Sequence, residues 1–171
     1  MSDSKSAPIA IGPQGGEILS VIGDNYRILV SGKQTNGAFS TIDMLIPPGS
    51  GPGPHSHTSF YESFYIIDGE VEVHSEDGSY VAKKGSFVVI PEGGIVHNFK
   101  NVTNRVAHLL CSVVPAGLEE FFEEIFVPVA ADTFLPPPVM TPESAKKLKA
   151  IAEKHGQIVY PANYLDKQLV K

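Results

Sequence analysis

Four side chains in the middle of the chain have the types and the spacing of a metal site. His55 and His57 are separated by one residue, and Glu62 follows five residues later. A further histidine, His97, lies in a later segment of similar strand character. On an extended segment, residues i and i+2 project to the same side of the backbone, so both imidazoles of the pair can reach one ion. Three neutral imidazoles and one carboxylate suit a divalent transition metal such as Fe, Mn, Ni, Cu or Zn, and they leave positions open for water, dioxygen or substrate.

The glutamate is the most informative of the four residues. By period-two alternation, Glu62 shares one face of its segment with Phe64 and Ile66. A carboxylate among apolar neighbours inside a barrel is costly unless it is paired or coordinated. The alternative, in which Glu62 points outward at a rim, is less consistent with this alternation. The pattern therefore favours Glu62 as a metal ligand.

The segments that must position these ligands are short and are interrupted by turns. The chain has 16 Gly and 14 Pro among 171 residues, which argues against a bundle of long helices. Strand patterns are expected over residues 17–22, 26–30, 39–46, 62–74, 80–83, 86–90, 97–101 and 105–114. Strands this short and this closely spaced indicate a sandwich or a small barrel. The Pro- and Gly-rich stretch 47–54 cannot form a helix, so we expect the chain to be extended where it enters His55.

Helical periodicity replaces strand periodicity after residue 115. Apolar residues at spacings of three and four predict an amphipathic helix over 118–126. A second helix is expected to begin after the N-cap Thr141 and to end at Gly156. The proline-rich segment 127–140 between the helices is interpreted as a surface crossing, a dimer contact or a lid.

The expected organisation has three parts: a flexible N-terminal arm over 1–16, a β-barrel over 17–115, and a helical extension packed on the barrel over 116–171. The net charge of -6 provides no basic face for nucleic acid or for acidic lipid. No stretch approaches the roughly 18 apolar residues of a membrane span, and the polar N-terminus lacks the apolar core of a signal peptide. We therefore expect a cytoplasmic protein that binds neither nucleic acid nor membrane. The one cysteine, Cys111, is interpreted as a small core residue.

Two blocks around the ligands resemble the two conserved motifs of the cupin superfamily. The first block comprises Gly49, His55, His57, Glu62 and Gly69, and the second comprises Gly85, Pro91, Gly93, His97 and Asn101. The second block departs from the family pattern at one point, because three residues instead of two separate Gly93 from His97. Segments 35–39 and 115–122 are in addition similar to small single-domain cupins of the quercetin 2,3-dioxygenase-like group.

This resemblance implies an all-β fold, the cupin double-stranded β-helix or jelly-roll barrel, followed by C-terminal α-helices. It implies one divalent transition metal held inside the barrel by His55, His57, Glu62 and His97, with Glu62 also able to act as a base toward a hydroxylated substrate. It favours a homodimeric, metal-dependent dioxygenase acting on a small aromatic or enol-type molecule. A non-catalytic ligand- or metal-binding cupin, or a metal-dependent isomerase, lyase or decarboxylase, are the alternatives, because a fold does not select among these activities.

Four further residues are candidates for contacting the substrate, because they share faces with the ligands or with the strand beside them: Met44, Phe64, Ile66 and Phe99. Plain core filling is an equal alternative for each of them. His108 is interpreted as a satisfied strand residue, with the orientation of a metal ligand as the alternative role. The remaining histidines, His74 and His155, are expected to be solvated.

Overall fold

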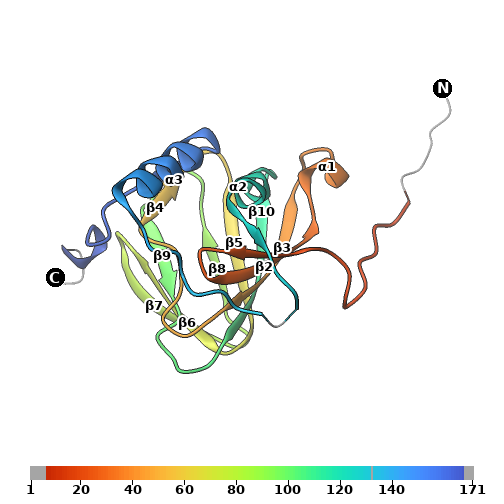
Figure 1. Ribbon diagram of the computed structural model, residues 1–171, viewed down its shortest axis with the longest axis horizontal. Coiled ribbons are helices and arrows are strands. Elements are labelled where there is room, and N and C mark those ends of the chain that lie inside the picture. The colour runs from red at the N-terminus through yellow and green to blue at the C-terminus, as the bar shows by residue number, and fades with distance from the viewer. Residues whose placement is uncertain (1–6, 132, 168–171) are drawn as a thin grey trace.

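Two antiparallel β-sheets form the body of the protein in a computed structural model that describes residues 7–131 and 133–167 (Figure 1). The first sheet contains, in spatial order, β11 (Val127–Pro128), β1 (Ile18–Val21), β2 (Asp24–Val30), β3 (Ser40–Ile46), β10 (Ala107–Val114), β5 (Tyr61–Asp68) and β8 (Phe87–Ile90). The second contains β12 (Gln157–Val159), β4 (His55–His57), β9 (His97–Lys100), β6 (Glu70–Ser75) and β7 (Gly78–Lys83). This arrangement confirms the predicted all-β jelly-roll class.

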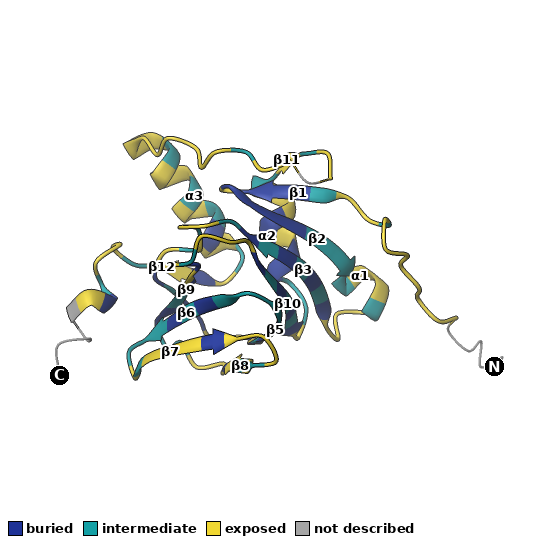
Figure 2. Ribbon diagram, turned by 90° about the horizontal axis from the view of Figure 1, so that it is seen from below, coloured by how far each residue is buried: buried dark blue, intermediate teal, exposed yellow. Residues whose placement is uncertain are grey.

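The core lies between the sheets and follows the alternation of apolar residues along the central strands. On β3, Ile42 and Met44 are buried, and they pair in register with Cys111 and Leu109 on β10. Successive side chains of a strand point to opposite faces, so each of these strands contributes every second residue to the core. Burying a side chain of this size contributes about 1.5–3 kcal/mol relative to leaving it exposed. In Figure 2, β2 and β3 lie above and β6 lies below, and each of them carries dark blue, buried segments.

The single strand expected over 62–74 is in fact two strands that belong to different sheets. β5 ends at Asp68, β6 begins at Glu70, and Gly69 between them has φ +75°. A Cβ on Gly69 would lie 3.0 Å from the Cα of Ala107, so the corner requires a residue without a side chain. The buried positions are even-numbered up to Ile66 on β5 and odd-numbered from Val71 on β6, so the alternation shifts by one residue at this corner.

Both predicted helices are present, and they lie together over one end of the sheets (Figure 1). α2 (Leu118–Ile125) buries Leu118, Phe121 and Phe122, as its amphipathic pattern requires. α3 (Pro142–Lys154) begins at the N-cap Thr141, whose side chain accepts a hydrogen bond from the Ser144 amide. Two shorter helical turns, α1 (Gly32–Thr35) and the 3-10 helix η1 (Leu165–Lys167), were not predicted.

The C-terminal extension contributes strands as well as helices. β12 pairs with β4 in the second sheet, and β11 pairs with β1 in the first sheet. The expected arm over 1–16 is described from residue 7 onward; residues 1–6 lie outside the described residues, as do residues 132 and 168–171 of the expected extension. The described part of the arm is mostly exposed, and the Pro13 carbonyl accepts a hydrogen bond of 2.6 Å from Nη1 of Arg27.

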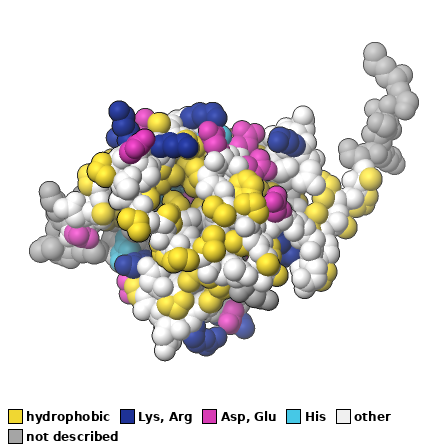
Figure 3. Space-filling view, viewed as in Figure 1, with side chains coloured by type: hydrophobic (Ala, Val, Ile, Leu, Met, Phe, Trp, Pro, Cys, Tyr) yellow, Lys and Arg dark blue, Asp and Glu magenta, His cyan; other side chains and the backbone are white. Residues whose placement is uncertain are grey.

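The surface seen in Figure 3 carries hydrophobic side chains over its middle, with Lys and Arg at its upper and lower margins. Positive charge on this face is therefore divided between separate groups. Of the helices in the described ranges, none has the length and apolar composition needed to cross a membrane.

The loop that leads into β4 approaches β9 so closely that one of its glycines cannot accept a side chain. Gly51 has φ +141°, and a Cβ built on it would overlap the carbonyl oxygen of Phe99, whereas Gly53 in the same loop has open space around it. We expect Gly51→Ala to lower the free energy of unfolding by about 2–4 kcal/mol and Gly53→Ala to change it by about 0.5 kcal/mol or less. Urea unfolding of both variants measures this difference, and equal midpoints would contradict the close approach.

Candidate metal centre

The four predicted ligands come from both sheets and face the space between them. β4 supplies His55 and His57, and His97 at the start of β9 pairs in register with His55. Glu62, near the start of β5, comes from the other sheet, where it pairs with Val113 and Ile90. The jelly-roll topology is therefore what brings a carboxylate of one sheet up to the imidazoles of the other.

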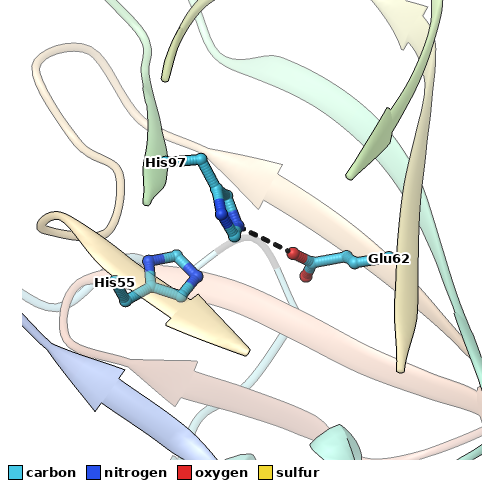
Figure 4. A group of neighbouring side chains, drawn as sticks. All are labelled: His55, Glu62 and His97. Carbon is cyan, nitrogen blue, oxygen red and sulfur yellow. Dashed lines mark ion pairs between the residues drawn. The ribbon is translucent and has the colours of Figure 1, made fainter. Parts of the chain in front are cut away.

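Three of the four residues converge as a group. Ligand atoms of His55, Glu62 and His97 all lie within 4.8 Å of one another, and Figure 4 shows the three side chains pointing toward a common centre. Nε2 of His97 lies 3.5 Å from Oε2 of Glu62. His57 lies outside this group of three, but its Nε2 atom is 3.4 Å from the same Oε2, and its ring stacks on Phe60. The carboxylate of Glu62 is thus the centre of the cluster.

The backbone determines which nitrogen of each ring is free. In all three histidines Nδ1 lies beside a backbone carbonyl oxygen: His55 with Gly53 at 2.9 Å, His57 with Phe60 at 3.1 Å, and His97 with Ile95 at 3.0 Å. Because a carbonyl oxygen can only accept a hydrogen bond, Nδ1 carries the proton and Nε2 presents its lone pair.

The free nitrogens point at a group that cannot satisfy them. Nε2 of His97 is buried and makes no hydrogen bond of good geometry, although the Glu62 carboxylate is close. In the neutral tautomer, this nitrogen and the carboxylate oxygen are both acceptors, so a cation must lie between them for both to be satisfied. The residues present therefore fit a divalent metal ion.

The protonation states of the cluster also match those of metal ligands. Burial opposes the ionisation of Glu62, but a proton held between its carboxylate and the rings of His57 and His97 outweighs burial and keeps the pKa of the Glu62 carboxyl well below its usual range. A divalent cation at this position would take the place of that proton. Desolvation of the His55 ring, with a smaller effect from His97, lowers the pKa of His55 to about 4. At neutral pH the carboxyl is thus ionised and the His55 imidazole is neutral, the forms in which both bind metal.

The comparison with protein families agrees with this geometry. The family model described as the cupin domain matches residues 42–113, a span that contains all four predicted ligands. Residues 42–113, the part of the β-barrel that carries the cluster, form a cupin domain.

Two curated relatives of this cupin domain are similar over part of their length. Quercetin 2,3-dioxygenase of Bacillus subtilis is 25% identical over 109 residues, which cover 64% of this chain and 32% of that protein. An oxalate-binding protein of Thermotoga maritima is 32% identical over 71 residues, which cover 42% of this chain and 58% of that protein. The chain thus spans about a third of the first relative and 58% of the second.

Solved structures that superpose on this chain belong to proteins named for different activities. A predicted oxalate decarboxylase from Thermotoga maritima superposes with a TM-score of 0.50 at 27% identity, covering 54% of this chain and 80% of that chain. Ectoine synthase from P. lautus superposes with a TM-score of 0.53 at 23% identity, covering 76% of this chain and 93% of that chain. The second likeness shows the cupin fold alone.

A cavity of about 180 Å³ adjoins the cluster, and His55 and Glu62 form part of its wall. Of the predicted substrate contacts, Met44 and Phe99 line this cavity. Phe64 and Ile66 do not line it; they are buried in the core of the cupin barrel. Phe64 packs edge-on against Phe99 at 5.2 Å between ring centroids, so it supports a wall residue and does not face the cavity itself.

Two residues of the site were missed in the sequence. Cys111 is buried as expected for a core residue, but its Sγ–H also donates to Oε1 of Glu62 at 3.6 Å. Burial raises the pKa of the Cys111 thiol well above its usual range, so the thiol keeps its proton. Asp24 falls in the turn between the expected strands 17–22 and 26–30, but it begins β2 and lines the cavity. Its alternation with Tyr26, which also lines the cavity, is the pattern that could have revealed it.

The remaining histidines of the described residues are occupied elsewhere. His108 bonds to Asp43, which also accepts a hydrogen bond of 2.7 Å from Arg27, so His108 is a satisfied strand residue. His74 lies 2.8 Å from the hydroxyl of Ser79. His155 was expected to be solvated, but its ring meets that of Phe121 of α2 edge-on at 6.2 Å between centroids, and its Nε2 atom lies 2.8 Å from Glu124. It therefore helps to join α3 to α2 and has no part in the metal centre.

Proposed function

We propose that this cupin domain binds one divalent transition metal through His55, His57, Glu62 and His97 and acts as a dioxygenase on a small aromatic or enol-type substrate. The observation that carries the proposal is the set of unprotonated Nε2 atoms that meet an ionised carboxylate at the wall of a cavity. A divalent metal bound there would supply Lewis acidity and a position for dioxygen. The dioxygenase activity for which the Bacillus subtilis relative is named supports this choice of reaction.

The protein's own residues have defined tasks in this reaction. Glu62 lines the cavity, so its carboxylate can reach a substrate hydroxyl. Because contacts with His57 and His97 hold the pKa of Glu62 low, this carboxylate is a weak base and is suited to orient the hydroxyl proton rather than to keep it. The thiol of Cys111 holds the other carboxylate oxygen in place. Apolar walls that include Phe99 exclude water from the bound ring.

A second candidate function, binding or decarboxylation of a small dicarboxylate, is supported by the curated relative and the solved structure from Thermotoga maritima. The charge of the cavity disfavours it. Asp24 and Glu62 both line the wall, and the described lining residues include no Lys or Arg that could pair with an anion. A dianion would therefore depend on the metal alone for compensation of its charge.

Oxygen uptake tests the proposal directly. Protein stripped of metal is reloaded with one metal at a time and supplied with flavonols, catechols and diketones in an oxygen electrode. We expect uptake that requires both metal and substrate, with a ring-opened or carbon–carbon-cleaved product in mass spectra. If no metal supports uptake with any of these compounds, the dioxygenase assignment is wrong. Carbon dioxide released from oxalate without oxygen uptake would favour the second candidate.

We also propose that the chain works as a homodimer in the cytoplasm. Edge strand β8 exposes Phe87 and Val89, and its neighbour β5 exposes Tyr61 and Tyr65. Exposed apolar side chains on and beside an edge strand are suited to pack against a second copy of the chain. Light scattering after size exclusion should give twice the mass of one chain, and a monomer at micromolar concentration would contradict the dimer.

A further inference from the structure

The cavity beside the metal centre contains a second carboxyl group. Asp24 is 4% exposed, and Oδ2 accepts a hydrogen bond of 3.0 Å from the hydroxyl of Tyr26. Its other oxygen, Oδ1, accepts a hydrogen bond from the hydroxyl of Ser50. Within the described residues, no Lys, Arg or His forms an ion pair with it. A buried carboxyl group with only neutral partners destabilises a fold, and such groups are concentrated at functional sites.

Local geometry aims Asp24 into the cavity. The hairpin between β1 and β2 turns at Ile22 and Gly23, which have φ values of +54° and +102°. Positive φ at both central residues is typical of the two-residue turn that joins antiparallel strands. Asp24 is therefore the first residue of β2, and Asp24 and Tyr26 line the cavity as residues i and i+2 of that strand.

Burial raises the pKa of Asp24 to about 6, although hydrogen bonds from Ser50 and Tyr26 act in the opposite direction. The carboxyl group is thus largely ionised in mildly alkaline solution. In that state it accepts hydrogen bonds from a ligand and repels a second anion.

Much of the cavity wall comes from outside the residues 42–113 that match the cupin family model. Asp24 and Tyr26 precede this span, and Phe122 and Gln157 follow it. Gln157 on β12 pairs in register with His57, is 6% exposed, and has an Nε2 atom without a hydrogen-bond partner among the described residues. Segments outside the span that matches the family model therefore supply polar groups to the cavity wall.

The size of the cavity limits the ligand. Its volume of about 180 Å³ is close to the roughly 150 Å³ of an engineered cavity that holds benzene, and below the roughly 300–1,000 Å³ of pockets for drug-sized ligands. Aromatic rings such as Phe99 and Phe122 supply flat apolar walls. A molecule with a single ring fits this space.

We propose that Asp24 determines substrate specificity: the cavity takes a single-ring molecule whose oxygen atoms reach the metal centre and whose far end presents a hydroxyl or an ammonium group to the Asp24 carboxylate. This inference rests on the proposed function for the metal-bound end of the molecule. Selection at the Asp24 end is an additional property and can be measured without turnover.

Three catechols with the same metal-binding end test this selection. Methylcatechol, aminomethylcatechol and protocatechuate carry a neutral, a cationic and an anionic group, respectively, across the ring from one hydroxyl. Their affinities for the zinc-loaded full chain are measured by calorimetry without oxygen in mildly alkaline buffer. We expect the aminomethyl compound to bind about tenfold more tightly than methylcatechol, and protocatechuate about tenfold more weakly, because of one charge-assisted contact.

The variant Asp24→Asn should change these affinities in opposite directions. We expect the aminomethyl compound to lose about tenfold, protocatechuate to gain about tenfold, and methylcatechol to stay within about twofold. The control Asp68→Asn makes the same change at a half-exposed carboxyl group outside the cavity, and it should leave all three affinities unchanged. If Asp24→Asn does not fold, Asp24→Ser serves as the neutral variant.

Each outcome decides the proposal. Unchanged affinities in the Asp24 variant, a shift of all three in one direction, or no binding of any catechol to the wild-type protein would overturn it. A chain that consumes no oxygen but shows the opposite shifts would refute the dioxygenase assignment and retain the role of Asp24. Oxygen consumption without the opposite shifts would retain the dioxygenase and refute the role of Asp24.

Discussion

Replacing His97 with alanine is expected to abolish stoichiometric metal binding. His97 is 1% exposed, and its buried Nε2 atom has no hydrogen-bond partner among the described residues. The variant therefore removes a side chain whose free nitrogen is suited to bind the metal. Loss of a residue that only orients a ligand lowers metal affinity by about 10–100-fold, so loss of a ligand should lower it by at least about 100-fold. We expect His57→Ala to reduce metal sharply as well, because its Nε2 atom lies 3.4 Å from the Glu62 carboxylate.

Elemental analysis of protein purified without a metal-affinity tag measures this loss. His74→Ala is the matched control, since His74 bonds to Ser79 on a neighbouring strand and lies outside the cluster. Circular dichroism shows whether each variant is folded. Stoichiometric metal retained in folded His57→Ala and His97→Ala proteins would refute the site.

Replacing Asp24 with asparagine is expected to stabilise the protein at neutral and alkaline pH. The pKa of Asp24 is about 6 in the folded chain, above its ordinary value of 3.8. Such a group contributes stability that is fully present below 3.8 and is lost as the pH rises through about 6. The difference between the two pKa values corresponds to a loss of about 3 kcal/mol, which the asparagine variant avoids.

The measurement is the difference in unfolding free energy between wild type and variant across pH, with metal removed from both proteins. Between about pH 4.5 and about pH 8, the advantage of Asp24→Asn should grow by about 2 kcal/mol. Titrations of Glu62 and His55, which line the same cavity, occur in both proteins and cancel in the difference. An advantage that does not change with pH would contradict the uncompensated burial of Asp24.

Asp43→Asn provides a control of opposite sign. Burial opposes ionisation of Asp43 as well, but hydrogen bonds from His108 and Arg27 outweigh it and lower the pKa of the Asp43 carboxyl. Its contribution to stability is therefore present above its ordinary pKa and is lost in acid, so Asp43→Asn should destabilise the protein at neutral pH. A more stable Asp24 variant with altered ligand selection would show that the wild-type chain keeps this carboxyl at the expense of stability.

The sequence identifies the ligands from two sources. Alternation along single segments places His55 and His57 on one face and Glu62 among apolar residues, and it also indicates the all-β class. The resemblance to the two cupin motifs adds His97, which lies 35 positions after Glu62. The first source depends on neighbours along the chain, which a sequence displays directly, and the second depends on motifs known from other proteins.

Contacts between distant segments were decided only by the tertiary structure. The thiol of Cys111 and the carboxylate of Glu62 are 49 positions apart, and Asp24 and Ser50 are 26 apart. Alternation shows that a side chain faces inward, but the packing of the two sheets decides what it meets there. For that reason Phe64, a predicted substrate contact, lies in the core behind Phe99. Asp24, which falls between two expected strands, lines the cavity.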